Sequence, residues 1–325
     1  MTNEAKIVSK VLVLDSNAKC YDSIKAFCDS HNLIGLKVQH DNIMSVLKSN
    51  VDLGAILMAE EYGDNAHGGV SLAREIHEIR PDLPIFLRRE TSDHLDDFFE
   101  KDRKLFSAAY TINGIANLHQ AIDESIFSLV YPSALVRGIT ELTKTALESQ
   151  FRGMGVEIAS PYIVRDRIIF GEIFTLIPIE GSWCRGYMML QAEEESLLRL
   201  VKADKTYIDA DSADDFRNLN NVLGEITNLI WGAFKNKYIN YSENNANLAQ
   251  VPLVINHLHR YISFGSENPQ LCFKYTLLDG DHKDEKSMVV YQRFVFNLSW
   301  SPENFKENQF STDDELFDSG ELELF

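Results

Sequence analysis

The sequence is poor in the residues that build disulfide frameworks and metal sites. Its 325 residues contain four cysteines, Cys20, Cys28, Cys184 and Cys272, and none belongs to a CxxC pair or to a zinc-ligand pattern with histidine. We therefore expect free thiols, as in a reducing compartment. His257 and His259 share one face of a predicted strand, but without a third ligand nearby they favour an ordinary edge position over a metal site.

Long apolar runs are also missing. No stretch approaches the roughly 18 to 20 apolar residues of a membrane helix. The first ten residues, MTNEAKIVSK, lack the basic and apolar regions of a secretory signal. These absences predict a cytoplasmic protein that does not enter a membrane.

Positive charge is scarce. The chain has 31 Lys and Arg against 49 Asp and Glu, a formal net charge of −18. Such a field repels phosphate backbones and anionic lipid surfaces, and no local basic patch overcomes it, so neither nucleic acid nor membrane is expected as a partner. Residues 301–325 alone carry −7. We expect this acidic tail to be disordered, with a short partner-docking motif built on its interspersed Phe and Leu as the alternative.

Motifs for nucleotide binding and serine catalysis are absent as well. Gly68 and Gly69 lack the further glycines of a phosphate-binding loop, and the run from Ile262 to Ser266 lacks the first glycine of GxSxG. What the sequence does contain is an ordinary globular balance, with 45% hydrophobic and 25% charged residues. Its length suits two domains, each with its own core.

The first 131 residues alternate between short apolar runs and amphipathic stretches, which predicts an α/β domain with a parallel, doubly wound sheet. The predicted strands are Lys10–Leu14, Gly35–Val38, Leu53–Ala59, Leu83–Leu87 and Ala108–Ile112. The predicted helices are Asn17–Asp29, Ile43–Ser49, Val70–Ile79, Asp93–Lys101 and Ile115–Leu129. Ligands of such sheets bind at the carboxyl ends of the strands.

Pro132 interrupts a helical pattern, so we place a boundary there and assign residues 132–300 to a second domain. A helix is predicted over Ala134–Phe151, followed by a mixture of strands and helices typical of an α+β layer structure. The predicted strands are Tyr162–Val164, Ile168–Pro178, Arg185–Gln191, Val251–Ile255, His257–Phe264, Leu271–Leu278 and Ser287–Phe296. Helices are predicted over Ala192–Lys202 and Asp214–Lys237.

The long helix over Asp214–Tyr238, DDFRNLNNVLGEITNLIWGAFKNKY, is the most informative stretch. On a helical wheel a core-facing stripe is formed by Val222, Leu223, Ile226, Leu229, Ile230 and Ala233. A second stripe lies about 130° away and is formed by Asn221, Glu225, Asn228 and Gly232. Because residues three apart are neighbours on a helix, Glu225 and Asn228 can reach one partner together, and Gly232 leaves room for its approach. On spacing alone, a solvated helix face is the simpler interpretation.

The N-terminal pattern resembles the receiver domain of response regulators, a flavodoxin-like fold. KVLVLDSN is similar to its first strand and acidic turn, LGAILMAEE to its third strand, LPIFLRR to its fourth and SAAYTING to its fifth. In this resemblance Asp15 is the acidic residue after strand one, but Ser16 follows it instead of a second acid. The phosphate-acceptor position falls on Met58 or Ala59, and the hydroxyl position on Arg88 or Arg89.

The resemblance therefore implies a degenerate receiver domain that is not phosphorylated in the usual way, because Mg²⁺ needs oxygen ligands beside the acceptor. Such a module would dock a partner, dimerise or serve as a scaffold. Glu60 and Glu61 follow the acceptor position closely. Either could mimic a phosphorylated aspartate, although solvated turn residues are the simpler interpretation.

The segment NVLGEITN, Asn221 to Asn228, resembles the active helix of the CheC/CheX family of chemotaxis phosphatases, whose pattern is Glu-x-x-Asn. The resemblance covers residues 133–300, and the CheX branch fits better because the helix over 133–151 holds no second Glu-x-x-Asn. Asn221 stands where the family often has Asp or Ser. Pro252 is similar to a proline that follows the active helix in that family.

This resemblance implies a phosphatase acting on a phosphorylated CheY-like response regulator. Asn228 would enter the partner's site and hold a water in line with the phosphorus, and Glu225 would pair with the partner's lysine. Asn221 and Gly232 would contribute to docking. Mg²⁺ would be bound by the partner, with no cofactor or metal on this chain. The alternative is a non-catalytic binding module resembling the flagellar switch proteins, and a homodimer is compatible with either function.

Overall fold

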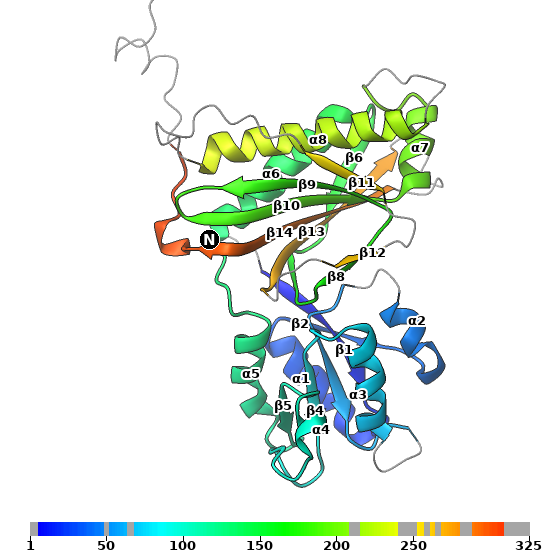
Figure 1. Cartoon of the computed structure of the whole chain (residues 1–325), viewed down its shortest axis with the longest axis vertical. Coiled ribbons are helices and arrows are strands. Elements are labelled where there is room, and N and C mark those ends of the chain that lie inside the picture. The colour runs from blue at the N-terminus through cyan, green and yellow to red at the C-terminus, as the bar shows by residue number, and fades with distance from the viewer. Residues whose placement is uncertain are drawn as a thin grey trace, which may run out of the picture.

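The computed structural model describes residues 6–48, 52–63, 68–207, 215–239, 252–256, 261–263, 268–279 and 288–308 (Figure 1). Within these residues, both halves of the chain contribute strands to one 12-stranded sheet. The strands follow the order β11-β9-β10-β14-β13-β7-β1-β3-β4-β5, with β2 also paired to β1 and β6 to β13. A separate two-stranded sheet contains β8 and β12.

The N-terminal half builds a parallel sheet in the order β2-β1-β3-β4-β5. Its strands are β1 (Val8–Leu14), β2 (Leu33–Lys37), β3 (Ala55–Ala59), β4 (Ile85–Arg88) and β5 (Ala108–Tyr110). Its α-helices are α1 (Ala18–Ser30), α2 (Ile43–Leu47), α3 (Gly68–Ile79), α4 (Glu100–Arg103) and α5 (Leu118–Ser125). Two 3₁₀ turns, η1 (His40–Asn42) and η2 (Ile115–Asn117), precede α2 and α5.

Helices cover both faces of this parallel sheet. Val11 and Val13 of β1 pack in one core cluster with residues of α1 and α5, while Leu12 and Leu14 pack in another with residues of α2 and α3. Side chains alternate between the two faces of a strand, so a strand between two helical layers must be apolar throughout. The continuous apolar run KVLVL predicted this arrangement. The mixed α/β character of the half is thus confirmed.

Two of the predicted N-terminal helices are wrong in extent. Residues 93–99 are bends and turns, and α4 is a single turn that begins only at Glu100. The Arg89 side chain bonds to the His94 carbonyl and the Asp97 carboxylate here, so tertiary contacts rather than helical bonds hold part of this segment. The predicted helix over Ile115–Leu129 is divided into η2 and the shorter α5.

The C-terminal half has helices on an antiparallel sheet. Its helices are α6 (Ser133–Gln150), α7 (Glu194–Lys202) and α8 (Asp215–Tyr238), with a 3₁₀ turn η3 (Pro302–Asn304). Its strands are β6 (Met154–Ile158), β7 (Tyr162–Val164), β8 (Ile168–Phe170), β9 (Ile173–Glu180), β10 (Cys184–Ala192), β11 (Leu253–Asn256), β12 (Tyr261–Ser263), β13 (Gln270–Asp279) and β14 (Met288–Trp300). Strands β9 and β10 form a hairpin in which Glu180 pairs with Arg185.

Three C-terminal predictions need correction. The single strand expected over Ile168–Pro178 is two strands, because β8 leaves the large sheet and pairs with β12. Strand β6, which pairs with β13, was not predicted. The strand expected over His257–Phe264 is reduced to Tyr261–Ser263, and His257 and His259 lie outside the described residues.

Helices α6 and α8 lie side by side and pack against the sheet (Figure 1). Their approach depends on Gly138 of α6, since a Cβ atom there would lie 1.5 Å from the Tyr238 hydroxyl of α8. At the carboxyl end of α8 the Trp183 indole donates a 2.8 Å hydrogen bond to the Tyr238 carbonyl. The sheet and α6 thus fix the rotation of α8.

The two halves meet strand to strand. Val8 and Ser9 of β1 pair in parallel with Tyr162 and Ile163 of β7, which in turn pairs antiparallel with β13. Pro132 is the N-cap residue of α6, but the division at residues 131 and 132 into separate domains stays a prediction. The described part of the chain contains no helix long and apolar enough to cross a bilayer. The predicted tail lies mostly outside the described residues.

Candidate functional site

Helix α8 buries one face against the sheet and α6 and leaves the opposite face in solvent. Its buried hydrophobic side chains are Leu219, Val222, Leu223, Ile226, Ile230, Trp231, Phe234 and Tyr238. The prediction that Leu229 belongs to this face is wrong, because Leu229 is 36% exposed. The buried face instead extends to Thr227 and Trp231, so it is rotated by about 50° relative to the predicted stripe.

The Thr227 side chain explains this rotation. Its hydroxyl donates to the Leu223 carbonyl at 2.7 Å and accepts a second 2.7 Å bond from Thr175 of β9. Both threonines are fully buried. A buried hydroxyl needs such partners, so the Thr175–Thr227 pair faces the sheet. The next residue, Asn228, is about 100° further around the helix and therefore points away.

The three polar residues predicted as a site, Asn221, Glu225 and Asn228, are all exposed on α8. Glu225 and Asn228 make no side-chain hydrogen bond or ion pair with the described residues. The rotated core lies almost directly opposite them, further than the roughly 130° expected from the sequence. One carboxylate and two amides are therefore exposed on the helix, and within the part of the chain that the structure describes they have no side-chain partner.

Two glycines flank Asn228 at four residues on either side. A Cβ atom at Gly224 or at Gly232 would have no neighbour within 4 Å. Each glycine costs roughly 1 kcal/mol relative to alanine in a helix interior, and no packing within the chain requires it. This contrasts with Gly138, where α8 itself occupies the space. No side chain therefore protrudes from the helix four residues before or four residues after Asn228.

The predicted degenerate site of the N-terminal half is filled by an ion pair. Arg88, at the end of β4, donates from Nε to Oδ2 of Asp15 at 2.5 Å and from Nη1 to Oε1 of Glu90 at 2.5 Å. The Arg88 and Asp15 side chains are only 4% and 5% exposed. Burial would lower the Arg88 pKa, but the hydrogen bonds to Asp15 and Glu90 outweigh it and raise the pKa above its usual range. A guanidinium therefore already neutralises the carboxylate of Asp15.

The remaining residues of this site support the same picture. Met58 and Ala59, at the acceptor position, are buried. Arg89 binds Glu60 at 2.9 Å and Asp97 at 2.6 Å. The hydrogen bonds that Arg89 donates to Asp97 raise the Arg89 pKa most, against the opposing effect of burial. Glu60 is thus engaged by Arg89, an arrangement the sequence alone did not predict.

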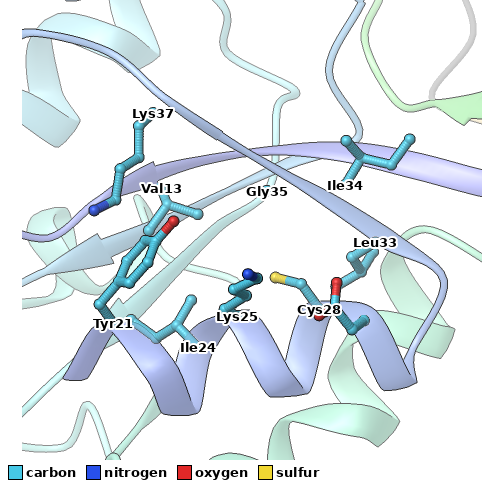
Figure 2. A pocket seen from close by; sticks show the side chains of 10 residues that line it. Val13, Tyr21, Ile24, Lys25, Cys28, Leu33, Ile34, Gly35 and Lys37 are labelled. Atoms are coloured by element: carbon cyan, nitrogen blue, oxygen red, sulfur yellow. The ribbon is translucent and has the colours of Figure 1, made fainter.

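One cavity lined by described residues lies in the N-terminal half, away from α8. A cavity of about 230 Å³ lies between α1 and β2, where the Lys37 ammonium sits 3.4 Å from the centre of the Tyr21 ring (Figure 2). It belongs to the N-terminal half, and Cys28 on its wall is a buried thiol whose pKa burial raises to about 11. Among the described residues no three His, Cys, Asp or Glu side chains gather as a metal site.

A family model matches part of the C-terminal half. Residues 173–276, about a third of the chain, match the family described as chemotaxis phosphatase CheX. This segment runs from the start of β9 through α8 into β13, so it includes Glu225 and Asn228. The CheX-like character predicted from NVLGEITN is confirmed. The match does not reach the N-terminal half.

Solved chemotaxis proteins are similar over about half of the chain. The chemotaxis protein CheX from Vibrio vulnificus is 17% identical with a TM-score of 0.37, covering 50% of this chain and 99% of that one. A chemotactic CheC-like protein from Shewanella oneidensis MR-1 is 15% identical, with a TM-score of 0.32 and coverage of 50% and 95%. CheX of Borrelia burgdorferi, in a complex with CheY, BeF₃ and Mg²⁺, is 15% identical, with a TM-score of 0.26 and coverage of 49% and 94%. No curated protein matches the chain by sequence.

Proposed function

We propose that this protein hydrolyses the aspartyl phosphate of a CheY-like receiver domain supplied by a separate protein. The observation that carries the proposal is the outward, unpaired Glu225–Asn228 face of α8 within the segment that matches CheX. An acyl phosphate is already prone to hydrolysis, and the receiver domain brings its own Mg²⁺. The phosphatase therefore needs only to position a water and orient the partner.

Asn228 is the residue assigned to the water. Its carboxamide both donates and accepts hydrogen bonds and does not titrate near neutral pH. It can therefore hold a water against the phosphorus at any physiological pH. Because it projects from the middle of a 24-residue helix fixed by Thr175 and Trp183, the amide is carried on a rigid support. Rigidity matters because a misplacement of about 1 Å can cost a factor of about 100 in rate.

Glu225 is assigned to the partner's lysine. It lies three residues before Asn228, so both side chains leave the same face. With no cation of its own chain bound to it among the described residues, its carboxylate is available to an incoming ammonium group. Asn221 lies one turn earlier and supplies a further hydrogen-bonding group. Gly232 leaves space for the partner's backbone one turn later.

The N-terminal half we infer to be a degenerate, doubly wound receiver domain. Its support is the parallel strand order β2-β1-β3-β4-β5, which is that of flavodoxin-like folds. The residues at the acceptor position, Met58 and Ala59, are buried, and the Arg88 guanidinium is bound to the Asp15 carboxylate. Among the described residues, the acceptor position then offers no carboxylate for phosphorylation, and Asp15 is already paired. The phosphorylated substrate must come from another chain, and we propose that the encounter takes place in the cytoplasm.

The decay of an acyl-phosphorylated response regulator tests the function directly. Intact protein should accelerate phosphate release, and Asn228→Ala should remove the acceleration. Asn236→Ala is the matched control, because Asn236 is also exposed on α8, two turns away. Equal decay with wild type and Asn228→Ala would refute the catalytic assignment.

The second candidate is a non-catalytic binding module of the same fold. The observation that favours it is the Arg88–Asp15 pair, because a paired Asp15 supports the inference that the N-terminal half has lost receiver chemistry. In that case Glu225→Ala and Asn228→Ala would weaken association with the regulator and leave its rate of dephosphorylation unchanged. A homodimer is compatible with either function, and sedimentation of the intact chain would reveal it.

A further inference from the structure

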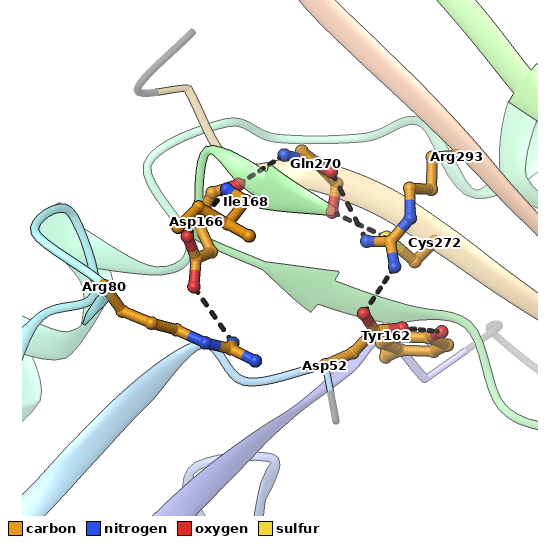
Figure 3. A network of polar contacts seen from close by, with 8 residues as sticks. All are labelled: Asp52, Arg80, Tyr162, Asp166, Ile168, Gln270, Cys272 and Arg293. Atoms are coloured by element: carbon orange, nitrogen blue, oxygen red, sulfur yellow. Dashed lines mark hydrogen bonds and ion pairs between the residues drawn. The ribbon is translucent and has the colours of Figure 1, made fainter. Parts of the chain in front are cut away.

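A buried polar network joins the two halves where β1 meets β7 (Figure 3). Asp52, just before β3, forms an ion pair with Arg293 of β14. Tyr162 of β7 donates a 2.6 Å hydrogen bond to the other oxygen of the same carboxylate. The Arg293 and Asp52 side chains are 2% and 10% exposed. The Asp52 charge of one half is therefore neutralised mainly by the Arg293 charge of the other.

A second ion pair crosses the same boundary. Arg80, which follows α3, binds Asp166 at 2.9 Å, and these side chains are 1% and 0% exposed. Arg80 also donates to the Leu47 carbonyl within its own half. Gln270 of β13 donates a 2.7 Å bond to the Asp166 carbonyl and so connects this pair to the sheet. Two buried ion pairs, connected through Gln270, thus link the two halves.

Two further hydrogen bonds cross the boundary between the halves. The Ser9 hydroxyl of β1 donates a 2.8 Å bond to the Ile163 carbonyl of β7. The Arg165 guanidinium donates to the Ser125 carbonyl at 2.8 Å. Burial would raise the pKa of Asp52, but Arg293 and the Tyr162 hydroxyl outweigh it and hold the pKa below its ordinary value. The carboxylate therefore stays ionised inside the junction.

Separating the partners of such a buried ion pair costs much free energy. Removing one partner leaves the other as an uncompensated charge in a low-dielectric site, which is much more costly than losing an exposed pair. If the halves opened as independently moving domains, both ion pairs would break together with the β1–β7 pairing. Directional polar contacts also select one register among the alternatives that apolar packing tolerates.

We propose that the N-terminal half is permanently docked on the CheX-like half and covers the β7 end of its sheet. The two halves then unfold as one cooperative unit. The Asp52–Arg293–Tyr162 and Arg80–Asp166 contacts fix the register of this junction. The N-terminal half is then not a receiver that swings between two positions. The Asp15–Arg88 pair lies just beyond the other end of β1, about 20 Å from the junction by the rise of the strand. The junction therefore does not cover this pair.

Buried cysteines report on this coupling in the intact chain. Cys28 of the N-terminal half and Cys184 of the C-terminal half are 2% and 0% exposed. Their alkylation by iodoacetamide under native conditions, followed by peptide mass spectrometry, measures how often each half opens. Cys272 is not a suitable reporter, because its sulfur lies 3.5 Å from Arg293.

The informative variant is Arg293→Met, with Arg185→Met as its control. Arg185 lies in the same half and pairs with Glu180, but its side chain is 55% exposed. Arg293→Met should raise the alkylation rates of Cys28 and Cys184 by the same factor, on the order of 100-fold or more. Arg185→Met should change neither rate appreciably. An increase confined to Cys184, or no increase at either cysteine, would overturn the proposal.

A milder variant covers the case in which Arg293→Met does not fold. Tyr162→Phe removes only the hydroxyl that donates to Asp52, and it should raise both rates by about 10-fold. The two cysteines must again respond equally. A response of Cys184 without Cys28 would show that the halves open independently, and the cooperative unit would be refuted.

Discussion

Gly232→Ala separates the stability of α8 from the docking function proposed for its outer face. Nothing lies within 4 Å of a Cβ atom at this position. The substitution therefore gains the helix propensity of alanine, about 1 kcal/mol, without a steric cost. We expect the free energy of unfolding to rise by roughly this amount, measured by urea denaturation followed through tryptophan fluorescence.

Gly138→Ala on the neighbouring helix is the matched contrast. It gains the same propensity, but its methyl group would lie 1.5 Å from the Tyr238 hydroxyl and 2.8 Å from Cζ of that ring. Tyr238 is 1% exposed and has little room to move. Overpacking of this kind costs about 1 to 3 kcal/mol, so the net effect should range from neutral to about 2 kcal/mol of destabilisation.

The same Gly232→Ala variant should bind its partner less well. If a receiver domain approaches the helix backbone beside Asn228, the added methyl group raises KM for the phosphorylated regulator and changes kcat less. A loss of stability in Gly232→Ala would show that this face is covered in the folded protein. A stabilised variant with unchanged KM would remove Gly232 from the docking surface.

Three further outcomes follow from the buried and exposed contacts. Asn228→Ala should leave the free energy of unfolding unchanged or raise it by up to about 0.5 kcal/mol, while phosphate release slows by about 100-fold; a marked loss of stability would mean that the amide serves the fold. Thr175→Val should lower the free energy of unfolding by about 1 kcal/mol in urea denaturation, because a buried bond to Thr227 is lost, and an unchanged midpoint would contradict that role. The pKa of Asp52 is held below its ordinary value, so the stability advantage of wild type over Asp52→Asn should be complete above about pH 5 and shrink below about pH 4; an advantage that grew on acidification would contradict this sign.

The sequence by itself determined the local features of helix α8. Its 3.6-residue periodicity placed Glu225 and Asn228 on a face away from the core, and both are exposed. Periodicity does not fix which edge of an apolar stripe is buried, because that depends on the neighbouring surface. The Thr175–Thr227 bond and the contact between Gly138 and Tyr238 set the rotation, and they left Leu229 outside the core.

The relation between the two halves was decided only by tertiary structure. Apolar runs predicted most of the strands, since a strand buried on both faces must be apolar regardless of its neighbour. The pairing of strands depends on contacts between residues far apart in the sequence. No local pattern connects Asp52 with Arg293 or Ser9 with Ile163. The sequence likewise predicted a degenerate site at Asp15 and Arg88 or Arg89, but it could not predict the Arg88–Asp15 ion pair, which exists because parallel strands bring their carboxyl ends together.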